Sequence, residues 1–150
     1  MLSGKPLNKV LIIQPSMFLG GVETSLIGLL DALVNQGCRV DLFLYRHEGE
    51  MLPYIPARVN LLPPIGAYTC FDRPIVRVLK SRYFMLGAAR ILSKAHLGLR
   101  RLLFKEKPST WKSMQYTARY LLPFLPEIGR GYDLALMFHG IPAVLAKKAG

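Results

Sequence analysis

The stretch QPSMFLGGVETS, residues 14–25, separates two segments of different character. Before it, residues 10–13 (VLII) are continuously apolar and largely β-branched, which predicts a strand buried on both faces. After it, apolar residues recur at helical spacing from Val22 to Leu33, and Gly37 is well placed to end a helix. The stretch is therefore a loop that leaves a buried strand and opens a helix.

A second strand is predicted directly after this helix, over residues 39–45 (RVDLFLY). Strand, loop, helix and strand in this order form a βαβ unit, whose crossover makes the two strands parallel. After a polar loop over 47–57, further strands are predicted over 58–63 and 134–138. The fold class expected is α/β, a Rossmann-like open parallel sheet flanked by helices.

The middle of the chain reads as helical, mostly over 75–107 and again over 109–122. The last residues, from about 141, begin a further helix where the sequence ends, so we expect an incomplete sheet. Residues 1–150 are expected to form a single lobe with a basic helical insertion at about 71–122. At 150 residues the chain is long enough for one domain with its own core.

The composition excludes a disordered chain, since 51% of the residues are hydrophobic. The opening residues do not form a signal peptide, and no stretch reaches the roughly 18 apolar residues of a membrane-spanning helix. Cys38 and Cys70 give no disulfide framework, so reduced thiols in a cytoplasmic protein are expected.

The positive charge is concentrated in one segment. Residues 71–120 hold twelve Lys and Arg against two acids, Asp72 and Glu106, a net charge of +10. The other residues hold eight bases and seven acids, and hence contribute +1. This asymmetry indicates a surface that meets an anionic partner.

A helical wheel through residues 80–105 separates basic from apolar side chains. Arg90, Lys94, Arg101 and Lys105 share one narrow face, with Lys80 beside it, and the opposite face holds Met85, Ala88, Leu92, Ala95, Leu99 and Leu103. The pattern predicts a basic amphipathic helix, or two helices that are broken near Gly98.

Such a helix, flanked by aromatic residues that include Trp111, is typical of attachment to an anionic membrane from the cytoplasmic side. The alternative is a helix that packs on the sheet by its leucine face and leaves its basic face in water. Nucleic acid is the competing anion, but the sequence holds no helix-turn-helix, zinc-binding or RNA-recognition pattern, so we do not expect it as the partner.

The glycine loop has the chemistry of a ligand site. A loop at the carboxyl end of a parallel strand lies where open α/β sheets bind ligands, and a helix N-terminus attracts phosphate or sugar oxygens. Gly20 and Gly21 would allow close approach and positive φ, while Glu23, next to Thr24, would accept hydrogen bonds from sugar hydroxyls. Alternatively, the glycines form only a tight turn and Glu23 only caps the helix. The loop is neither a dinucleotide fingerprint nor a P-loop.

Residues 9–50 (KVLIIQPSMFLGGVETSLIGLLDALVNQGCRVDLFLYRHEGE) resemble the start of family-4 glycosyltransferases of the GT-B fold, which open with a strand, a loop ending in Gly-Gly-x-Glu, a helix and a strand. Residues 131–148 (GYDLALMFHGIPAVLAKK) resemble a later strand of that family. The middle of the chain matches nothing specific in it.

The resemblance implies the first, acceptor-binding lobe of a two-lobed enzyme that moves a sugar from a nucleotide-sugar donor to a lipid-linked or polysaccharide acceptor of the cell envelope. Gly20 and Gly21 would face the donor phosphates, and Glu23 would lie at the mouth of the cleft. The donor-binding lobe is absent from this sequence, so the chain by itself is expected to be inactive.

The resemblance implies no catalytic metal, which agrees with the scattered histidines, His47, His96 and His139. His139 follows the last predicted strand, where it is either a catalytic or acceptor-binding residue or an ordinary polar residue of a turn. A non-catalytic basic module that binds an anionic membrane or a protein partner stays open as the alternative function.

Overall fold

The computed structural model describes residues 8–71, 73–105, 109–138 and 143–149. The chain divides into two compact units. The first comprises residues 1–64, 127–141 and 148–150, and the second comprises residues 65–126 and 142–147. The basic insertion expected at about 71–122 lies within the second unit.

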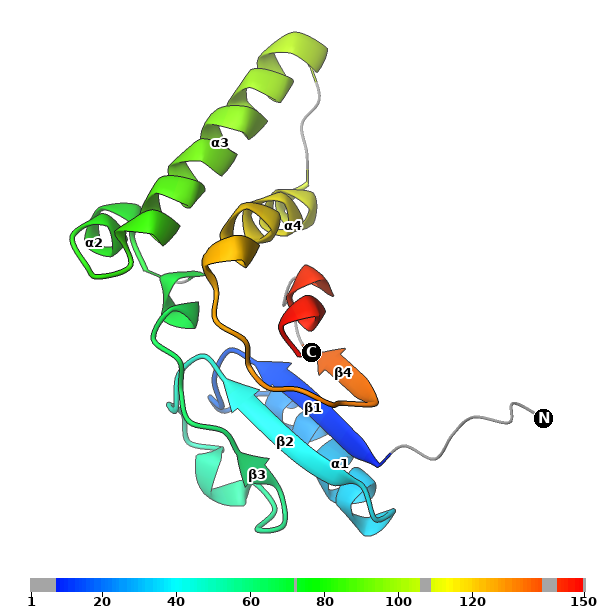
Figure 1. The fold of residues 1–150 in the computed structure, drawn as a ribbon. Coiled ribbons are helices and arrows are strands. Elements are labelled where there is room, and N and C mark those ends of the chain that lie inside the picture. Colours follow the sequence, from blue (N-terminus) through cyan, green and yellow to red (C-terminus); the bar gives the residue numbers. More distant parts are fainter. Residues whose placement is uncertain (1–7, 72, 106–108, 139–142, 150) are drawn as a thin grey trace. The chain divides into compact units, whose positions relative to one another are not determined.

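The first unit is built on a four-stranded sheet with the order β3-β2-β1-β4 (Figure 1). Its strands are β1 (Lys9–Gln14), β2 (Arg39–Leu44), β3 (Asn60–Leu61) and β4 (Leu134–Met137). All three pairings are parallel. The expected α/β, Rossmann-like open parallel sheet is thus confirmed.

The third strand is shorter than predicted. Residues 58–63 were expected to be extended, but β3 consists of Asn60 and Leu61 alone, followed by one more backbone bond from the Leu62 N–H to the Leu42 carbonyl (2.9 Å). Pro63 and Pro64 follow. Proline has no N–H to donate, so the ladder ends there.

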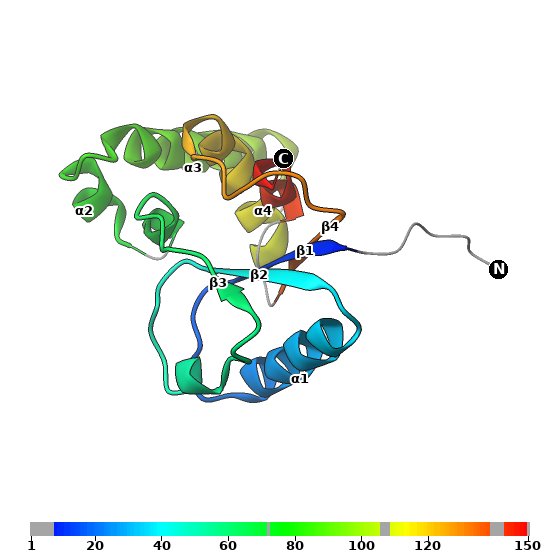
Figure 2. The same ribbon diagram turned by 60° about the horizontal axis from the view of Figure 1, so that its bottom comes forward.

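Helix α1 (Gly21–Asn35) covers one face of this sheet (Figure 2). Its buried residues Leu26, Leu30 and Val34 recur at steps of four, and they belong to the same core cluster as alternate residues of the strands, such as Val10 and Ile12 of β1. Gly37 follows the helix with φ +84°, the left-handed conformation expected of it.

The second unit is helical, with α2 (Ile75–Leu79), α3 (Phe84–Phe104) and α4 (Thr110–Leu121). The prediction that residues 75–107 are mostly helical is confirmed for the described residues 75–105, with a turn at residues 80–83, and residues 106–107 lie outside the described residues. In the turn, the Ser81 hydroxyl donates to the Val78 carbonyl (2.7 Å) and accepts from the Tyr83 N–H (3.1 Å). These local bonds replace helical ones. No break occurs at Gly98, which lies inside α3.

Helices α3 and α4 pack through small and polar side chains. Ser93 of α3 is fully buried, and its hydroxyl lies 3.3 Å from that of Thr117 on α4. The Tyr120 hydroxyl on α4 lies 2.8 Å from Nδ1 of His96. The inward face of α3 therefore runs through Leu86, Ala89 and Ser93, and it is a different face from the one that carries the predicted leucine stripe.

Near the end of the chain, residues Ala143–Lys148 form a 3-10 helix where a helix was expected to begin. Among the described residues, no helix has the length and apolar character needed to cross a membrane.

Candidate functional site

The loop between β1 and α1 lies at the carboxyl end of β1, as the sequence predicts. A second segment, residues 46–51 after β2, is hydrogen-bonded to it. The Met17 N–H donates to the Glu48 carbonyl (2.8 Å), and the Met51 N–H donates to the Met17 carbonyl (2.9 Å). Both segments leave the same edge of the sheet, which is where open α/β sheets bind ligands.

Gly49 makes the close approach of these two segments possible. It has φ +120°, and a Cβ at this position would lie 2.0 Å from the backbone carbonyl carbon and oxygen of Met17. Such contacts are impossible for any side chain, and the backbone conformation disfavours one as well. Glycine at position 49 therefore determines how closely the β2 segment contacts the loop.

The two glycines predicted to form the site differ in their surroundings. A Cβ added to Gly21 would meet no atom within 4 Å, so this position is open. A Cβ on Gly20 would lie 2.5 Å from Oε2 of Glu23. Gly20 has φ −173°, and neither glycine has positive φ, so the expected left-handed backbone is corrected: these glycines provide space, not a special conformation.

Glu23 connects the first turn of α1 to β1. Its Oε1 accepts a hydrogen bond of 3.2 Å from Nε2 of Gln14, the last residue of β1. Gln14 is only 1% exposed, and its Oε1 is buried without a hydrogen-bond partner among the described residues. A buried acceptor without a donor is energetically costly, and it marks a place where a hydroxyl or a water would be stabilised.

The N-terminus of α1 has no side-chain cap. Gly20 precedes the helix and offers no side-chain hydrogen bond to the first-turn amides. Thr24, also predicted to be part of the site, directs its hydroxyl to the Gly20 carbonyl (2.9 Å), so it supports the turn. The N–H groups of the first turn have no partner one turn earlier in the helix and would donate hydrogen bonds to an anionic or hydroxyl oxygen.

Carboxylates border the loop on two sides. Glu23 lies beside Gly20, and the exposed Glu50 accepts a hydrogen bond of 3.1 Å from the Leu19 N–H. Carboxylates accept hydrogen bonds from hydroxyls and repel phosphates, so they favour a sugar on their side of the loop. At Gly21, beside the uncapped N-terminus of α1, no side chain lies between the backbone amides and an approaching ligand.

Sequence reasoning missed Gln14, Gly49 and Glu50 as parts of this site. The segment HEGE, residues 47–50, was interpreted only as a polar loop. Since it directly follows a strand parallel to β1, its position at the same sheet edge could have been inferred from topology. The unpaired Gln14 oxygen depends on side-chain geometry, and no sequence pattern signals it.

The residues predicted to form the anion surface are not equivalent. Lys94, Arg101 and Lys105 are exposed. Lys80 is also exposed, but it follows α2 and does not belong to α3. The guanidinium of Arg90 donates to the carbonyls of Cys70 (2.6 Å) and Arg73 (2.5 Å), which holds together the second unit.

Two predicted residues cannot be placed. His139 lies outside the described residues, and Trp111 belongs to α4, but its side chain is not among those described. The described part of the chain contains no group of three or more His, Cys, Asp or Glu residues able to hold a metal ion.

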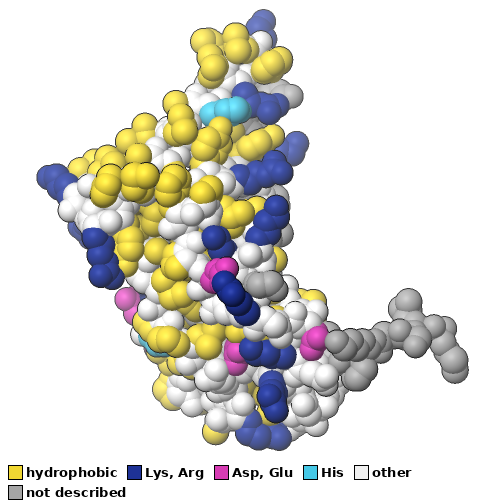
Figure 3. All heavy atoms as spheres, viewed as in Figure 1, with side chains coloured by type: hydrophobic (Ala, Val, Ile, Leu, Met, Phe, Trp, Pro, Cys, Tyr) yellow, Lys and Arg dark blue, Asp and Glu magenta, His cyan; other side chains and the backbone are white. Residues whose placement is uncertain are grey.

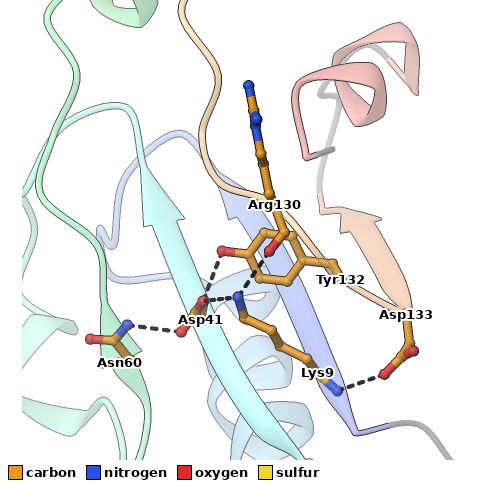
Figure 4. A network of polar contacts seen from close by, with 6 residues as sticks. All are labelled: Lys9, Asp41, Asn60, Arg130, Tyr132 and Asp133. Carbon is orange, nitrogen blue, oxygen red and sulfur yellow. Dashed lines mark hydrogen bonds and ion pairs between the residues drawn. The ribbon is translucent and has the colours of Figure 1, made fainter.

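A second polar cluster lies at the amino ends of the strands (Figure 4). Asp41 accepts hydrogen bonds from the Tyr132 hydroxyl (2.7 Å) and from Nδ2 of Asn60 (2.8 Å), and Nζ of Lys9 lies 3.8 Å from it. Asp133 accepts from the Lys9 N–H at 3.0 Å. These contacts tie β1, β2, β3 and the start of β4 together, so we assign the cluster to the stability of the sheet.

Comparison of the chain with protein-family models, with curated proteins and with solved structures finds no match.

Proposed function

We propose that the first unit is the acceptor-binding lobe of a glycosyltransferase that uses a nucleotide-sugar donor. The reaction would transfer the sugar from the donor diphosphate to an acceptor hydroxyl. The bond from the anomeric carbon to the phosphate oxygen breaks, a bond to the acceptor oxygen forms, and the hydroxyl proton leaves to a base or to solvent. The resemblance of residues 9–50 and 131–148 to family-4 glycosyltransferases supports this class of reaction.

The observation that carries the proposal is the open position at Gly21 beside the uncapped N-terminus of α1. The amides there carry part of the positive end of the helix dipole. An oxygen of the donor diphosphate would reach them without displacing a side chain. This arrangement needs no metal at the loop, since amides and dipole stabilise the charge.

The acceptor sugar would lie on the carboxylate side of the loop. Glu23 and Glu50 are available as acceptors for its hydroxyls, and Glu23 is bonded to the side chain of Gln14, whose Oε1 has no hydrogen-bond partner among the described residues. Binding at these groups orients a hydroxyl toward the donor and lowers the entropic part of the barrier. Glu23 and Glu50 are thus proposed to position the acceptor, with no direct part in bond breaking.

The test is sugar transfer by the protein produced from its whole reading frame. Labelled UDP-, GDP- and ADP-sugars are supplied together with extracted membrane lipids and cell-envelope polysaccharide, and label is followed into the acceptors. The variant Gly21→Leu should reduce transfer roughly a hundredfold, because misplacing the phosphate has costs of that order. Amide chemical shifts of Gly20 and Gly21 should change when the same nucleotide sugars are titrated in NMR experiments.

The matched control is Gly28→Leu. Gly28 lies in the same helix, and a Cβ there also meets no atom within 4 Å, but it is remote from the loop. This variant should keep its transfer activity. Equal activity of Gly21→Leu and the unmodified protein would contradict the role of the loop, and absence of both transfer and amide shifts would contradict the proposed function.

A further inference from the structure

Helix α3 exposes a continuous apolar face to its surroundings. Most of its exposed large apolar side chains recur at steps of three, four and seven along one side of the helix, which places them on one stripe. They are Phe84, Met85, Ile91, Leu92, Leu99, Leu102 and Leu103. Phe104, the last residue of the helix, is also exposed but lies off this stripe. Ala88 and Ala95, also exposed, lie between them on the same side.

This stripe is not used to hold the second unit together. The contacts with α2 and α4 come from the other side of α3, where Leu86, Ala89 and Ser93 are buried. Figure 3 shows hydrophobic side chains gathered over the part of the molecule where Figure 1 draws α3, with Lys and Arg side chains near them. A contiguous apolar surface of this length marks an interaction site in a folded protein.

Ile91 and Leu102 extend the exposed stripe beyond the leucine face predicted from the sequence, and on that side basic residues border it, since Lys94 lies three residues after Ile91 and Lys105 three after Leu102. Lys94, Arg101 and Lys105 are exposed and follow each other at steps of seven and four, so they form a line parallel to the leucines. The sequence from Arg73 to Lys105 contains no Asp or Glu. The partner of this surface therefore has to combine an apolar interior with negative charge at its boundary.

We infer that α3 lies in the plane of an anionic lipid surface, with its leucine stripe among the acyl chains and its row of bases at the lipid phosphates. A helix of 21 residues is about 30 Å long, which allows many lipids to contact it at once. The long stems of Lys and Arg let the charges reach the headgroups while the neighbouring leucines are buried. This inference concerns the second unit and stands apart from the proposed sugar transfer.

Nucleic acid does not fit the same surface. Binding to a phosphate backbone requires bases in the centre of the contact, with aromatic rings for stacking. Here the centre is aliphatic and the bases lie at its border. An acidic protein would satisfy the bases, but nothing in the stripe provides the polar contacts that such an interface normally contains.

The experiment is co-sedimentation of the chain with vesicles of phosphatidylcholine that contain about 30% phosphatidylglycerol, and with vesicles of phosphatidylcholine alone. We expect at least tenfold stronger partitioning to the anionic vesicles, and a decrease with added salt. The double variant Leu99→Gln/Leu102→Gln should weaken partitioning roughly a hundredfold, because two buried leucines are lost. Circular dichroism should show an unchanged helix content, since both side chains are exposed.

Two matched control variants test whether partitioning depends on α3 itself or on the loss of any exposed leucine or arginine. Leu19 is 77% exposed, like Leu102, but belongs to the first unit, so Leu19→Gln should leave partitioning unchanged. Arg39→Gln removes an exposed charge from the first unit and should have little effect, whereas Arg101→Gln should weaken binding to the anionic vesicles several-fold.

Several outcomes would overturn the inference. Equal partitioning to both kinds of vesicle would remove the role of anionic lipid. Sensitivity to Arg101→Gln combined with indifference to Leu99→Gln/Leu102→Gln would show adsorption by charge alone, without insertion of the leucines. An oligomer that dissociates on Leu102→Gln and does not bind vesicles would assign the stripe to contacts between copies of this chain.

Discussion

Glu23, in the first turn of α1, accepts its hydrogen bond from Gln14, the last residue of β1, at a distance of 3.2 Å. This bond joins the strand to the helix across the loop that carries the paired glycines. It satisfies the amide nitrogen of a side chain that is almost completely buried, and it holds a carboxylate beside Gly20.

The bond should make Gln14 and Glu23 energetically dependent on each other. Glu23→Leu removes the acceptor and leaves the buried amide of Gln14 without any partner, so it should lower the free energy of unfolding by about 1–3 kcal/mol. Gln14→Leu/Glu23→Leu removes both polar groups and should recover most of this loss. Urea denaturation of the two single variants and the double variant measures the coupling. Additive effects of the two substitutions would show that the bond does not contribute.

Gly49 should tolerate no side chain. Gly49→Ala adds a Cβ that would lie 2.0 Å from the backbone of Met17, in a backbone conformation with φ +120°. We expect a loss of about 2 kcal/mol or more in unfolding free energy. In contrast, Gly28→Ala, within α1 and in open space, should stabilise the protein by about 0.5–1 kcal/mol. Thermal denaturation of both variants measures this contrast, and a loss at Gly28 or neutrality at Gly49 would contradict it.

The close contact of α2 with α3 should depend on Gly87. A Cβ at this position would lie 2.8 Å from Cδ2 and 3.2 Å from the backbone nitrogen of Leu79. Gly87→Ala should therefore destabilise the second unit by about 1–3 kcal/mol, a cost typical of overpacking. Gly98→Ala, in the same helix but in open space, should be stabilising. Hydrogen exchange of α2 and α3 amides would locate the effect, and equal protection in both variants would refute it.

Two tyrosines should limit stability in alkali. The pKa of Tyr132 is raised, chiefly by burial and also by its hydrogen bond to Asp41 and the charge of that residue, and burial raises the pKa of Tyr68. Both hydroxyls stay protonated in the fold and ionise more readily when the chain unfolds. The contribution of the two tyrosines to the free energy of unfolding is therefore complete below about pH 10 and is lost as the pH rises above this value.

The measurement is urea denaturation between about pH 8 and pH 11. Tyr132→Phe removes a donor to Asp41 and should be less stable than the unmodified protein at pH 8. It should also lose less stability on the way to pH 11, because one of the two ionisations is gone. Tyr54→Phe, at an exposed tyrosine, serves as the control and should follow the unmodified protein. Parallel curves for Tyr132→Phe and the unmodified protein would exclude the effect.

The sheet and α1 could be predicted because local pattern and tertiary structure agree there. The apolar run at residues 10–13 is buried on both faces, and the predicted helical stripe packs in the same core through Leu26, Leu29, Leu30 and Leu33. Gly37 ends the helix as its conformational freedom suggests. Parallel topology then determines the edge at which the glycine loop lies.

The second unit shows where sequence patterns are insufficient. The turn at residues 80–83 depends on hydrogen bonds of one serine, and an amphipathic pattern continues through it without a visible break. The wheel separated leucines from bases, but it could not tell which side of α3 would pack, because Leu86, Ala89 and Ser93 form a less apolar face than the stripe. The role of Arg90 likewise depends on carbonyls of residues distant in sequence.

The pairing of β1 with β4 has a consequence for how the protein is made. Val10 of β1 pairs with Leu134 of β4, and β4 is synthesised more than 100 residues after β1. One edge of β1 therefore stays unpaired during most of the synthesis of the chain, until β4 is made. Until then β1 presents unpaired backbone groups to other nascent chains, and the long loop that closes this pairing slows its formation. We expect the first unit to be most vulnerable to aggregation during synthesis, before residue 137 has emerged.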